Sequence, residues 1–424
     1  MILHGEIFSS YENWIRSRER LIFRNKDVLD SYQYFNLKRI CSHFAIDYQT
    51  APGLDYLPEP LFKDNAVTLR TSGSKSGTQR PYLFPTRYYS LIEQHHLWRF
   101  THEHQIRHGA VVLLGYSNFD NNAHKLLEIK QRYASLGLNN DQWMWRYNRN
   151  ITPSIMRDFL ETLRVMKPRF LVCQPSQLDL IRYLVGDFEK LPFHLVSTGE
   201  TLYPSTLEFA KRNFAGVIDK MRCWDGGLSF YTCRAERKHI NDELCYVYHG
   251  STGHVLSTDF YNTCTPFIKY ANYDRGVIKE GLCDCGVYGR YFDSFEGGHA
   301  TLVKAGSQFI DGGAIVSEIT AFFNSRLHPD LQNTLIEKYG RFRIVSGIIF
   351  HVHQRADQSI DFTYQASHLL NEVEESMLKD MVSFVIFRTT ANVPEVRINF
   401  NPNLWSEGLR GSRNKFQCIE SEAL

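Results

Sequence analysis

Residues 71–80, Thr-Ser-Gly-Ser-Lys-Ser-Gly-Thr-Gln-Arg, gather side chains that suit the binding of phosphate groups. Hydroxyl groups surround the flexible glycines Gly73 and Gly77, and the cations Lys75 and Arg80 stand among them. A loop of this composition can enclose phosphate oxygens with backbone N–H groups while its cations neutralise their charge. It lacks the spacing of a Walker A loop, so a different nucleotide-binding fold is required. A polar surface turn is the alternative interpretation, because Ser- and Gly-rich turns are common.

Soft metal ligands form a second group, later in the chain. The group consists of Cys233, His239, Cys283 and Cys285. Three thiolates and one imidazole are the ligand set of a closed tetrahedral zinc site, which stabilises a fold and leaves no position for a catalytic water. Cys245 and Cys264 are spare ligands if the histidine points away. The alternative is that Cys233 and His239 are core residues and that the Cys-x-Cys pair is incidental.

The elements that must position these residues alternate between strands and helices. A strand at 66–70 leads into the 71–80 loop, and a helical pattern follows at 88–106. Further strands are predicted at 110–114, 170–173 and 193–196, and further helices at 154–166, 176–185 and 201–213. This alternation is typical of an α/β sheet with crossover connections.

The pattern changes after residue 233. Short strands and Gly-bearing turns fill 233–298 and predict a small β subdomain, and the region after about 300 is typical of a small α+β unit. We therefore expect an α/β protein with a large N-terminal domain, 1–297, and a small α+β C-terminal domain, 298–424.

The 71–80 segment resembles the phosphate loop of the adenylate-forming superfamily, whose pattern is Ser/Thr-Ser-Gly-Ser/Thr-Thr-Gly-x-Pro-Lys. Arg80 stands where that family usually has Lys. The resemblance implies a catalytic, charge-neutralising role for this arginine. It also implies that ATP phosphates are bound by Thr71, Ser72, Gly73, Ser74, Lys75 and Gly77.

Two further segments resemble the family's nucleotide motifs in the same order. Residues 196–202, Val-Ser-Thr-Gly-Glu-Thr-Leu, are similar to the adenine segment. The resemblance there implies contacts from Gly199, Glu200 and Thr201. Residues 223–229, Cys-Trp-Asp-Gly-Gly-Leu-Ser, fall where the family has an aromatic–Gly–x–Thr–Glu motif. The resemblance implies that Asp225 is the catalytic Mg²⁺ carboxylate and that Trp224 stands at the phosphate-contacting Thr position.

The last motifs concern the ribose, the hinge and the terminal lysine. Residues 266–274, Pro-Phe-Ile-Lys-Tyr-Ala-Asn-Tyr-Asp, resemble Pro-x-Ile-Arg-Tyr-Arg-x-x-Asp, and so imply nucleotide contacts from Lys269 and a ribose-binding role for Asp274. Gly297 and Gly298 fall at the family's interdomain hinge, around which the small domain usually rotates, but without its Arg. Residues 408–417 resemble the C-terminal Gly-Lys loop, which implies that Lys415 bridges the substrate carboxylate and an ATP phosphate.

The branch of the superfamily is suggested by the metal ligands. Phenylacetate–CoA ligase-like proteins, and related adenylate-forming proteins linked with capsule genes, often carry a similar Cys, His and Cys-x-Cys-Gly pattern, which implies a structural Zn²⁺. The implied reaction activates a carboxylic acid, aryl in our interpretation, as an acyl-adenylate and transfers it to coenzyme A. A carrier-protein thiol or an amine is the alternative acceptor. An alternative of another class is a non-catalytic, zinc-containing nucleotide-binding protein derived from such an enzyme.

Composition limits the remaining classes. The 424 residues are 43% hydrophobic and 14% aromatic, enough for a large core, and the formal charge of +2 does not favour nucleic acid as a partner. No apolar run reaches the roughly 18 residues of a membrane span and the N-terminus has no signal-peptide pattern, so we expect a cytoplasmic protein. The nine cysteines are an odd number and do not indicate a disulfide framework. A homodimer is left open.

Overall fold

The computed structural model describes part of the chain. The described residues are 25–49, 66–70, 81–85, 88, 92, 96, 104, 110–116, 125–128, 142–147, 152–200, 202, 204–223, 226–250, 254–298, 302–305, 308–312, 315–316, 319, 338–339, 349–366, 369–387, 395–404, 409–410, 415–416 and 419–422.

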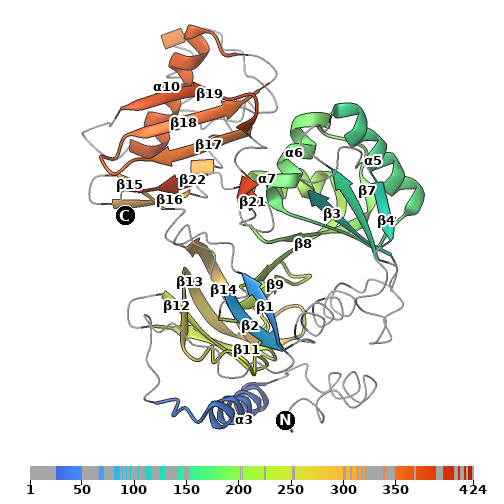
Figure 1. Ribbon diagram of the computed structural model, residues 1–424, viewed down its shortest axis with the longest axis vertical. Coiled ribbons are helices and arrows are strands. Elements are labelled where there is room, and N and C mark those ends of the chain that lie inside the picture. Colours follow the sequence, from blue (N-terminus) through green and yellow to red (C-terminus); the bar gives the residue numbers. More distant parts are fainter. Residues whose placement is uncertain are drawn as a thin grey trace.

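A twelve-stranded sheet has the order β11-β12-β13-β14-β10-β9-β8-β7-β6-β3-β5-β4. It runs from the lower part of the molecule, where β11–β14 lie, to the right-hand part with β3, β4 and β7 (Figure 1). Its strands are β3 (Val111–Tyr116), β4 (Lys125–Glu128), β5 (Gln142–Tyr147), β6 (Phe170–Cys173), β7 (Leu191–Thr198), β8 (Phe214–Arg222), β9 (Ser229–Thr232), β10 (Lys238–Ile240), β11 (Cys245–His249), β12 (His254–Asp259), β13 (Tyr270–Leu282) and β14 (Tyr288–Gly298). Strands β5, β3, β6, β7 and β8 are mutually parallel, whereas β4 and the series from β9 onward pair antiparallel. The predicted α/β region and the predicted β subdomain are thus joined edge to edge through β8 and β9.

Three helices accompany the parallel strands. They are α5 (Pro153–Met166), α6 (Pro175–Val185) and α7 (Pro204–Asn213). In α5 the buried residues Met156, Phe159, Leu160 and Leu163 repeat with the helical period, and Thr152 caps the helix by accepting a hydrogen bond from the Ile155 N–H. Together with residues of β3, β6 and β7 these helices form one hydrophobic core.

The antiparallel half of the sheet is covered by α3 (Lys26–Phe44) and by the hairpin of β1 (Ala66–Arg70) and β2 (Pro81–Pro85). Gln33 of α3 donates to Asp242 across 3.0 Å, while Tyr82 and Phe84 of β2 pack with Leu244 and Phe267. The β1–β2 hairpin, which flanks the 71–80 segment, therefore packs on residues that adjoin β11 and β13.

The described C-terminal residues form an α+β arrangement. Strands β17 (Ile349–Gln354), β18 (Ile360–Gln365), β19 (Val396–Phe400) and β22 (Ile419–Ser421) form a sheet in the order β19-β18-β17-β22. Helix α10 (Glu372–Phe387) and the hairpin of β15 (Leu302–Ala305) and β16 (Gln308–Asp311) share its core. Ile349 and Leu404 belong instead to the α5–α7 core, so this part of the chain contacts the parallel strands. The domain boundary at 297/298 remains a prediction.

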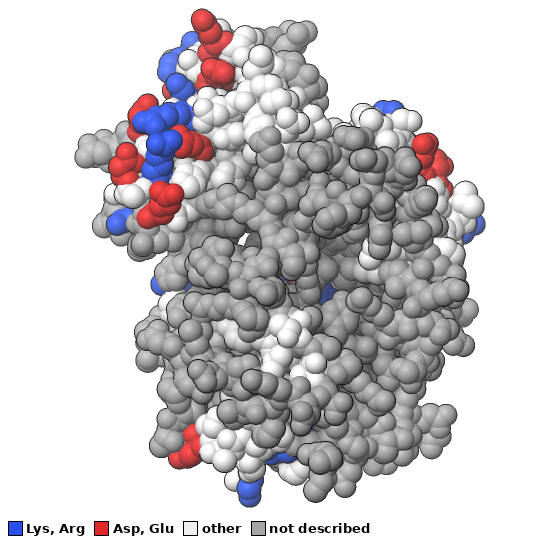
Figure 2. All heavy atoms as spheres, in the orientation of Figure 1, with Lys and Arg blue, Asp and Glu red and all other residues white. Residues whose placement is uncertain are grey.

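Charged side chains of both signs are interspersed on the visible face of the C-terminal part (Figure 2). Arg355 pairs with the partly buried Asp361, and Arg397 pairs with Glu395 at the surface. Such alternation agrees with the nearly balanced charge of the chain. Among the described residues, no helix is long and apolar enough to cross a membrane.

Most of the expected elements are confirmed where they are described. Two expectations differ: residue 104, inside the helix predicted at 88–106, lies in a turn, and β13 and β14 are long strands of 13 and 11 residues where short strands are expected. The strand at 170–173 has the predicted bounds, and the helices predicted at 154–166 and 176–185 each begin one residue earlier, at a proline. The helix predicted from residue 201 begins at Pro204. The α/β fold class is confirmed.

Candidate active site and metal centre

The carboxyl ends of β6 and β7 lie next to the first turn of α6. Gly199, with φ of +90°, and Glu200 follow β7 directly, and the Glu200 carboxylate accepts a hydrogen bond from the Ser176 N–H across 2.9 Å. An anion in this position is stabilised by the unpaired N–H groups and dipole of the helix N-terminus. The predicted adenine segment is therefore anchored to α6, at the edge where open parallel sheets bind ligands.

A buried thiol adjoins this edge but is not suited to chemistry. Cys173 ends β6 and is buried, and burial together with the nearby Glu200 carboxylate raises the pKa of its thiol. A thiol with a raised pKa stays protonated near neutral pH and is a poor nucleophile.

The turn between β8 and β9 contains the predicted magnesium carboxylate. Asp225 and Trp224 lie outside the described residues, but both flanks are described. The Arg222 guanidinium donates from Nη1 to the Gly227 carbonyl across 2.8 Å, and the Cys223 N–H donates to the Leu228 carbonyl across 2.8 Å. These two bonds close the turn from both sides.

Asp274, the predicted ribose acceptor, lies beside that turn. It is on β13 with a relative exposure of 6%, and its Oδ2 lies 3.8 Å from the Cys223 Sγ. In the β13–β14 ladder Asp274 stands directly opposite Gly298, one of the predicted hinge glycines. The structure thus brings the ribose motif, the flank of the magnesium motif and the predicted hinge together, although they are far apart in sequence.

Lys269 occupies a different neighbourhood. Its backbone is left-handed, with φ of +53°, and its N–H donates to the Thr258 hydroxyl across 3.0 Å. Its ammonium lies 4.6 Å from the centre of the Tyr48 ring and donates to the Gln49 carbonyl across 3.4 Å. This side chain is engaged by the residues that follow α3, and a contact with nucleotide remains a prediction.

The terminal lysine lies in a short hairpin. Strands β20 (Leu409–Arg410) and β21 (Lys415–Phe416) pair with Arg410 opposite Lys415. Leu404, five residues before β20, packs in the α5–α7 core. The Lys415 side chain is outside what the structure describes, and so are the residues Thr71, Ser72, Gly73, Ser74, Lys75, Gly77, Arg80 and Thr201.

Sequence reasoning missed a buried ionic group beneath the β8–β9 turn. The Arg222 guanidinium forms an ion pair with Asp259 across 3.0 Å, and the Tyr88 hydroxyl lies between them, accepting from the arginine and donating to the carboxylate. The side chains of Arg222 and Asp259 are 3% and 0% exposed. No local pattern marks these residues, because the three come from separate elements.

A second buried group has the residue types of a nucleophile and its base. His96 Nε2 lies 2.9 Å from the Ser229 hydroxyl, and the Asn241 amide donates to the same hydroxyl across 2.6 Å. All three residues are 0% exposed. This burial withholds the serine from any substrate, so we assign the group to the core.

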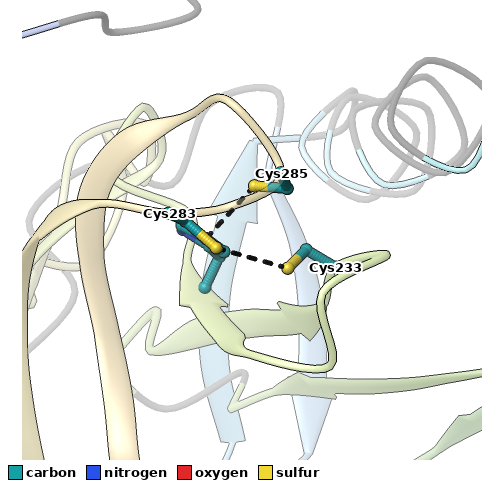
Figure 3. A group of neighbouring side chains, drawn as sticks. Cys233, Cys283 and Cys285 are labelled. Atoms are coloured by element: carbon teal, nitrogen blue, oxygen red, sulfur yellow. Dashed lines mark hydrogen bonds between the residues drawn. The ribbon is translucent and has the colours of Figure 1, made fainter.

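The four predicted zinc ligands are brought together. Their ligand atoms all lie within 4.8 Å of one another, and Figure 3 shows the three sulfurs turned toward a common point. The Sγ atoms of Cys233 and Cys283 are 3.8 Å apart, and the Cys285 Sγ lies 3.5 Å from the His239 Nε2. Zinc bonds of about 2.3 Å to sulfur and about 2.0–2.1 Å to nitrogen give tetrahedral edges of about 3.8 Å and about 3.5 Å. These two distances match the edges of a tetrahedral zinc site, and the spare ligands Cys245 and Cys264 lie outside the group.

Two hairpin turns with the same backbone pattern supply the thiols. In the β9–β10 turn, the Cys233 carbonyl accepts from the N–H three residues later, and its N–H donates to the carbonyl four residues later. Cys283 makes the same two bonds in the β13–β14 turn. The residues three positions after each cysteine, Glu236 and Gly286, both have positive φ, of +58° and +89°. Equivalent turns therefore aim both cysteines at the same point.

Comparisons with known proteins bear on the fold. No protein-family model matches the chain, and no curated protein sequence matches it. A crystal structure of 2-hydroxyisobutyryl-CoA ligase in the postadenylation state, in complex with R3-HIB-AMP, matches with a TM-score of 0.53 and 12% identity over 84% of this chain and 73% of that chain. The same ligase in complex with 2-HIB-AMP matches with a TM-score of 0.53 and 13% identity over the same shares. The chain has the fold of an adenylate-forming ligase.

Identity this low carries the fold and not the individual site residues. The roles of Glu200, Asp225, Asp274 and Lys415 remain predictions.

Proposed function

We propose that this protein uses ATP to activate a small carboxylic acid as an acyl-adenylate. The observation that carries the proposal is the position of Asp274 against Cys223, at the flank of the predicted magnesium segment, on an adenylate-forming ligase fold. A buried carboxylate beside a segment predicted to contact phosphate suits the recognition of ribose hydroxyl groups in ATP.

The chemistry assigns a task to each motif. The acid carboxylate attacks the α-phosphorus of ATP, pyrophosphate leaves, and an acceptor then displaces AMP. Attack by an anion on a polyanion requires charge neutralisation, for which we propose Arg80, Lys75 and a Mg²⁺ ion on Asp225. Lys415 is proposed to hold the carboxylate in line, and Asp274 the ribose.

Acid-dependent exchange of radiolabelled pyrophosphate into ATP, measured with a panel of aryl and fatty acids, tests this proposal. Asp274→Ala should lower kcat/KM for ATP about 10- to 150-fold, as expected for a lost hydrogen bond to a charged group of about 1.5–3 kcal/mol. Asp293→Ala is the matched control, because Asp293 lies at the surface of the adjacent strand β14 in an exposed pair with Lys279.

Lys415→Ala should lower the exchange rate about 10²- to 10³-fold, comparable to the loss of a donor that stabilises charge in a transition state. If no acid in the panel supports exchange while wild-type protein still binds ATP, the enzyme proposal fails. The protein is then better described as a non-catalytic nucleotide-binding derivative of the fold.

We propose coenzyme A as the acceptor, supported by the similarity in fold to a CoA ligase. AMP release in the presence of the activated acid should accelerate when coenzyme A is added. Acceleration by an amine or a carrier protein, but not by coenzyme A, would assign the alternative acceptor.

The zinc ion is proposed to be structural. Four clustered protein ligands would complete a tetrahedral site without an open position, and both thiol-bearing turns connect paired strands of the sheet. Purified protein should contain about one equivalent of zinc, and the Cys283→Ser/Cys285→Ser double variant should lose it. Cys41→Ser/Cys264→Ser is the matched control, since both thiols are buried outside the cluster. Less than about half an equivalent in wild-type protein would refute the site.

A further inference from the structure

A continuous series of buried hydrogen bonds connects the β8–β9 turn to β2. Its first members are Arg222 and Asp259. The arginine donates to the Gly227 carbonyl across 2.8 Å and to the Asp259 Oδ2 across 3.0 Å. The turn that contains residues 224 and 225 is thereby fixed to the end of β12.

The second part continues from the other oxygen of the same carboxylate. Asp259 Oδ1 accepts from the N–H groups of Tyr261 and Asn262 across 2.8 and 3.1 Å. Asn262 Oδ1 in turn accepts from the N–H groups of Cys264 and Thr265 across 3.0 and 3.1 Å. Two side-chain oxygens thus hold the connection between β12 and β13 in a fixed conformation.

The series ends on the strand that follows the 71–80 segment. The Thr265 hydroxyl donates to the Leu83 carbonyl across 2.8 Å and accepts from the Leu83 N–H across 3.2 Å. Thr265 and Asp259 are 0% and 1% exposed, and Asn262 is 1% exposed. Because water is excluded, each bond is costly to break and its geometry is well defined.

Close packing makes the arrangement rigid at the β8–β9 turn. Gly227 has φ of +75°, and a Cβ built on it would lie 2.4 Å from the Asp259 Oδ2. The carboxylate therefore occupies the space that a side chain would take, and the turn cannot move toward β12 without displacing Asp259.

We propose that the series Arg222–Asp259–Asn262–Thr265 positions β2 relative to the β8–β9 turn, and so aligns the two segments predicted to contact ATP phosphates. Thr265 is its most informative member, a positioning residue that acts through Leu83. The expected effect on catalysis rests on the proposed function. The structural coupling between β2 and the β8–β9 turn can be measured without substrate.

The test compares Thr265→Val, which removes the hydroxyl at nearly constant volume, with Thr265→Ser, which keeps it. In pyrophosphate exchange we expect Thr265→Val to lower kcat/KM for MgATP about tenfold while the KM of the acid stays within about twofold, and Thr265→Ser to restore most of the loss. Thr206→Val is the matched control, because Thr206 is buried and donates to Asp179 on α6, outside the series.

Amide hydrogen exchange followed by mass spectrometry gives the readout that needs no activity. Thr265→Val should accelerate exchange at 81–85 and also at 226–229, at the far end of the series, whereas Thr206→Val should change neither. Acceleration confined to 81–85 would overturn the proposal even in an active enzyme, because Thr265 would then act only locally. If wild-type protein shows no pyrophosphate exchange with any acid, the proposed function fails, while acceleration at both ends still supports the coupling.

Discussion

Alanine at Gly276 should destabilise the protein, whereas alanine at Gly281 in the same strand should not. A Cβ on Gly276 would lie 2.7 Å from the Ser294 carbonyl oxygen and 3.0 Å from the Phe292 ring. A Cβ on Gly281 would meet no atom of the described residues within 4 Å. Gly276 also lies at an irregularity of the β13–β14 ladder, two residues after Asp274.

The magnitude follows from two opposing effects. Replacing glycine by alanine lowers the entropy of the unfolded chain and stabilises by about 0.4–1 kcal/mol where the side chain fits. The contact at Gly276 involves backbone, which must shift, and overpacking of this kind costs about 1–3 kcal/mol. Subtracting the two variants cancels the entropy term, so their free energies of unfolding should differ by about 1–3 kcal/mol.

Thermal unfolding followed by circular dichroism measures this difference. For a cooperative unit of 150–250 residues it corresponds to a separation of about 2–12 °C between the two melting temperatures, with Gly281→Ala at or above wild type. Gly276→Ala should also weaken ATP binding, because the shift of β13 moves Asp274. Equal melting temperatures for the two variants would refute the packing argument.

Three further predictions concern buried charge, pH and metal. In a denaturant titration, Arg290→Met should lower the free energy of unfolding by about 3–5 kcal/mol, because it leaves the buried Asp242 carboxylate without its ion pair. Lys279→Met, which breaks an exposed ion pair, should lower it by at most about 1 kcal/mol. Burial and the neighbouring His104 lower the pKa of His194 below its ordinary 6.5, so the unfolded chain takes up a proton at this residue before the folded protein does as the pH falls. The melting temperature of wild-type protein should therefore decrease below about pH 6.5. That of His194→Gln should decrease less between about pH 7.5 and 5. A zinc chelator should lower the melting temperature of wild-type protein but not that of the Cys283→Ser/Cys285→Ser variant, and an unchanged wild-type value would count against a structural metal.

Several features of the fold could be predicted from sequence because they are locally encoded. The strand at 170–173 is a short apolar run, and α5 shows the helical period with Thr152 and a proline at its start. The zinc ligands could also be named, because thiols and imidazole are chemically distinctive and few residue types substitute for them.

Other features depended on contacts between distant elements. The sequence places Glu200 in the predicted adenine segment, but its carboxylate accepts a hydrogen bond from the first turn of α6. Lys269 keeps its motif spacing, but its ammonium is directed toward Tyr48. Side-chain direction at such positions follows from the packing of separate elements, which residue spacing does not record.

The sequence by itself indicated the alternation of strands and helices between residues 154 and 213, the α/β class and the candidate zinc ligands, since period, capping and ligand chemistry are properties of neighbouring residues. The candidate phosphate and ribose ligands came from the family resemblance of the motifs. Only the tertiary structure decided that Asp274 meets the flank of the 224–225 segment and that equivalent turns deliver Cys233 and Cys283 to one point. It alone revealed the buried Arg222–Asp259 pair. These contacts join residues 37 to 51 positions apart. Such contacts arise from strand pairing and side-chain packing across the sheet, and no local pattern specifies them.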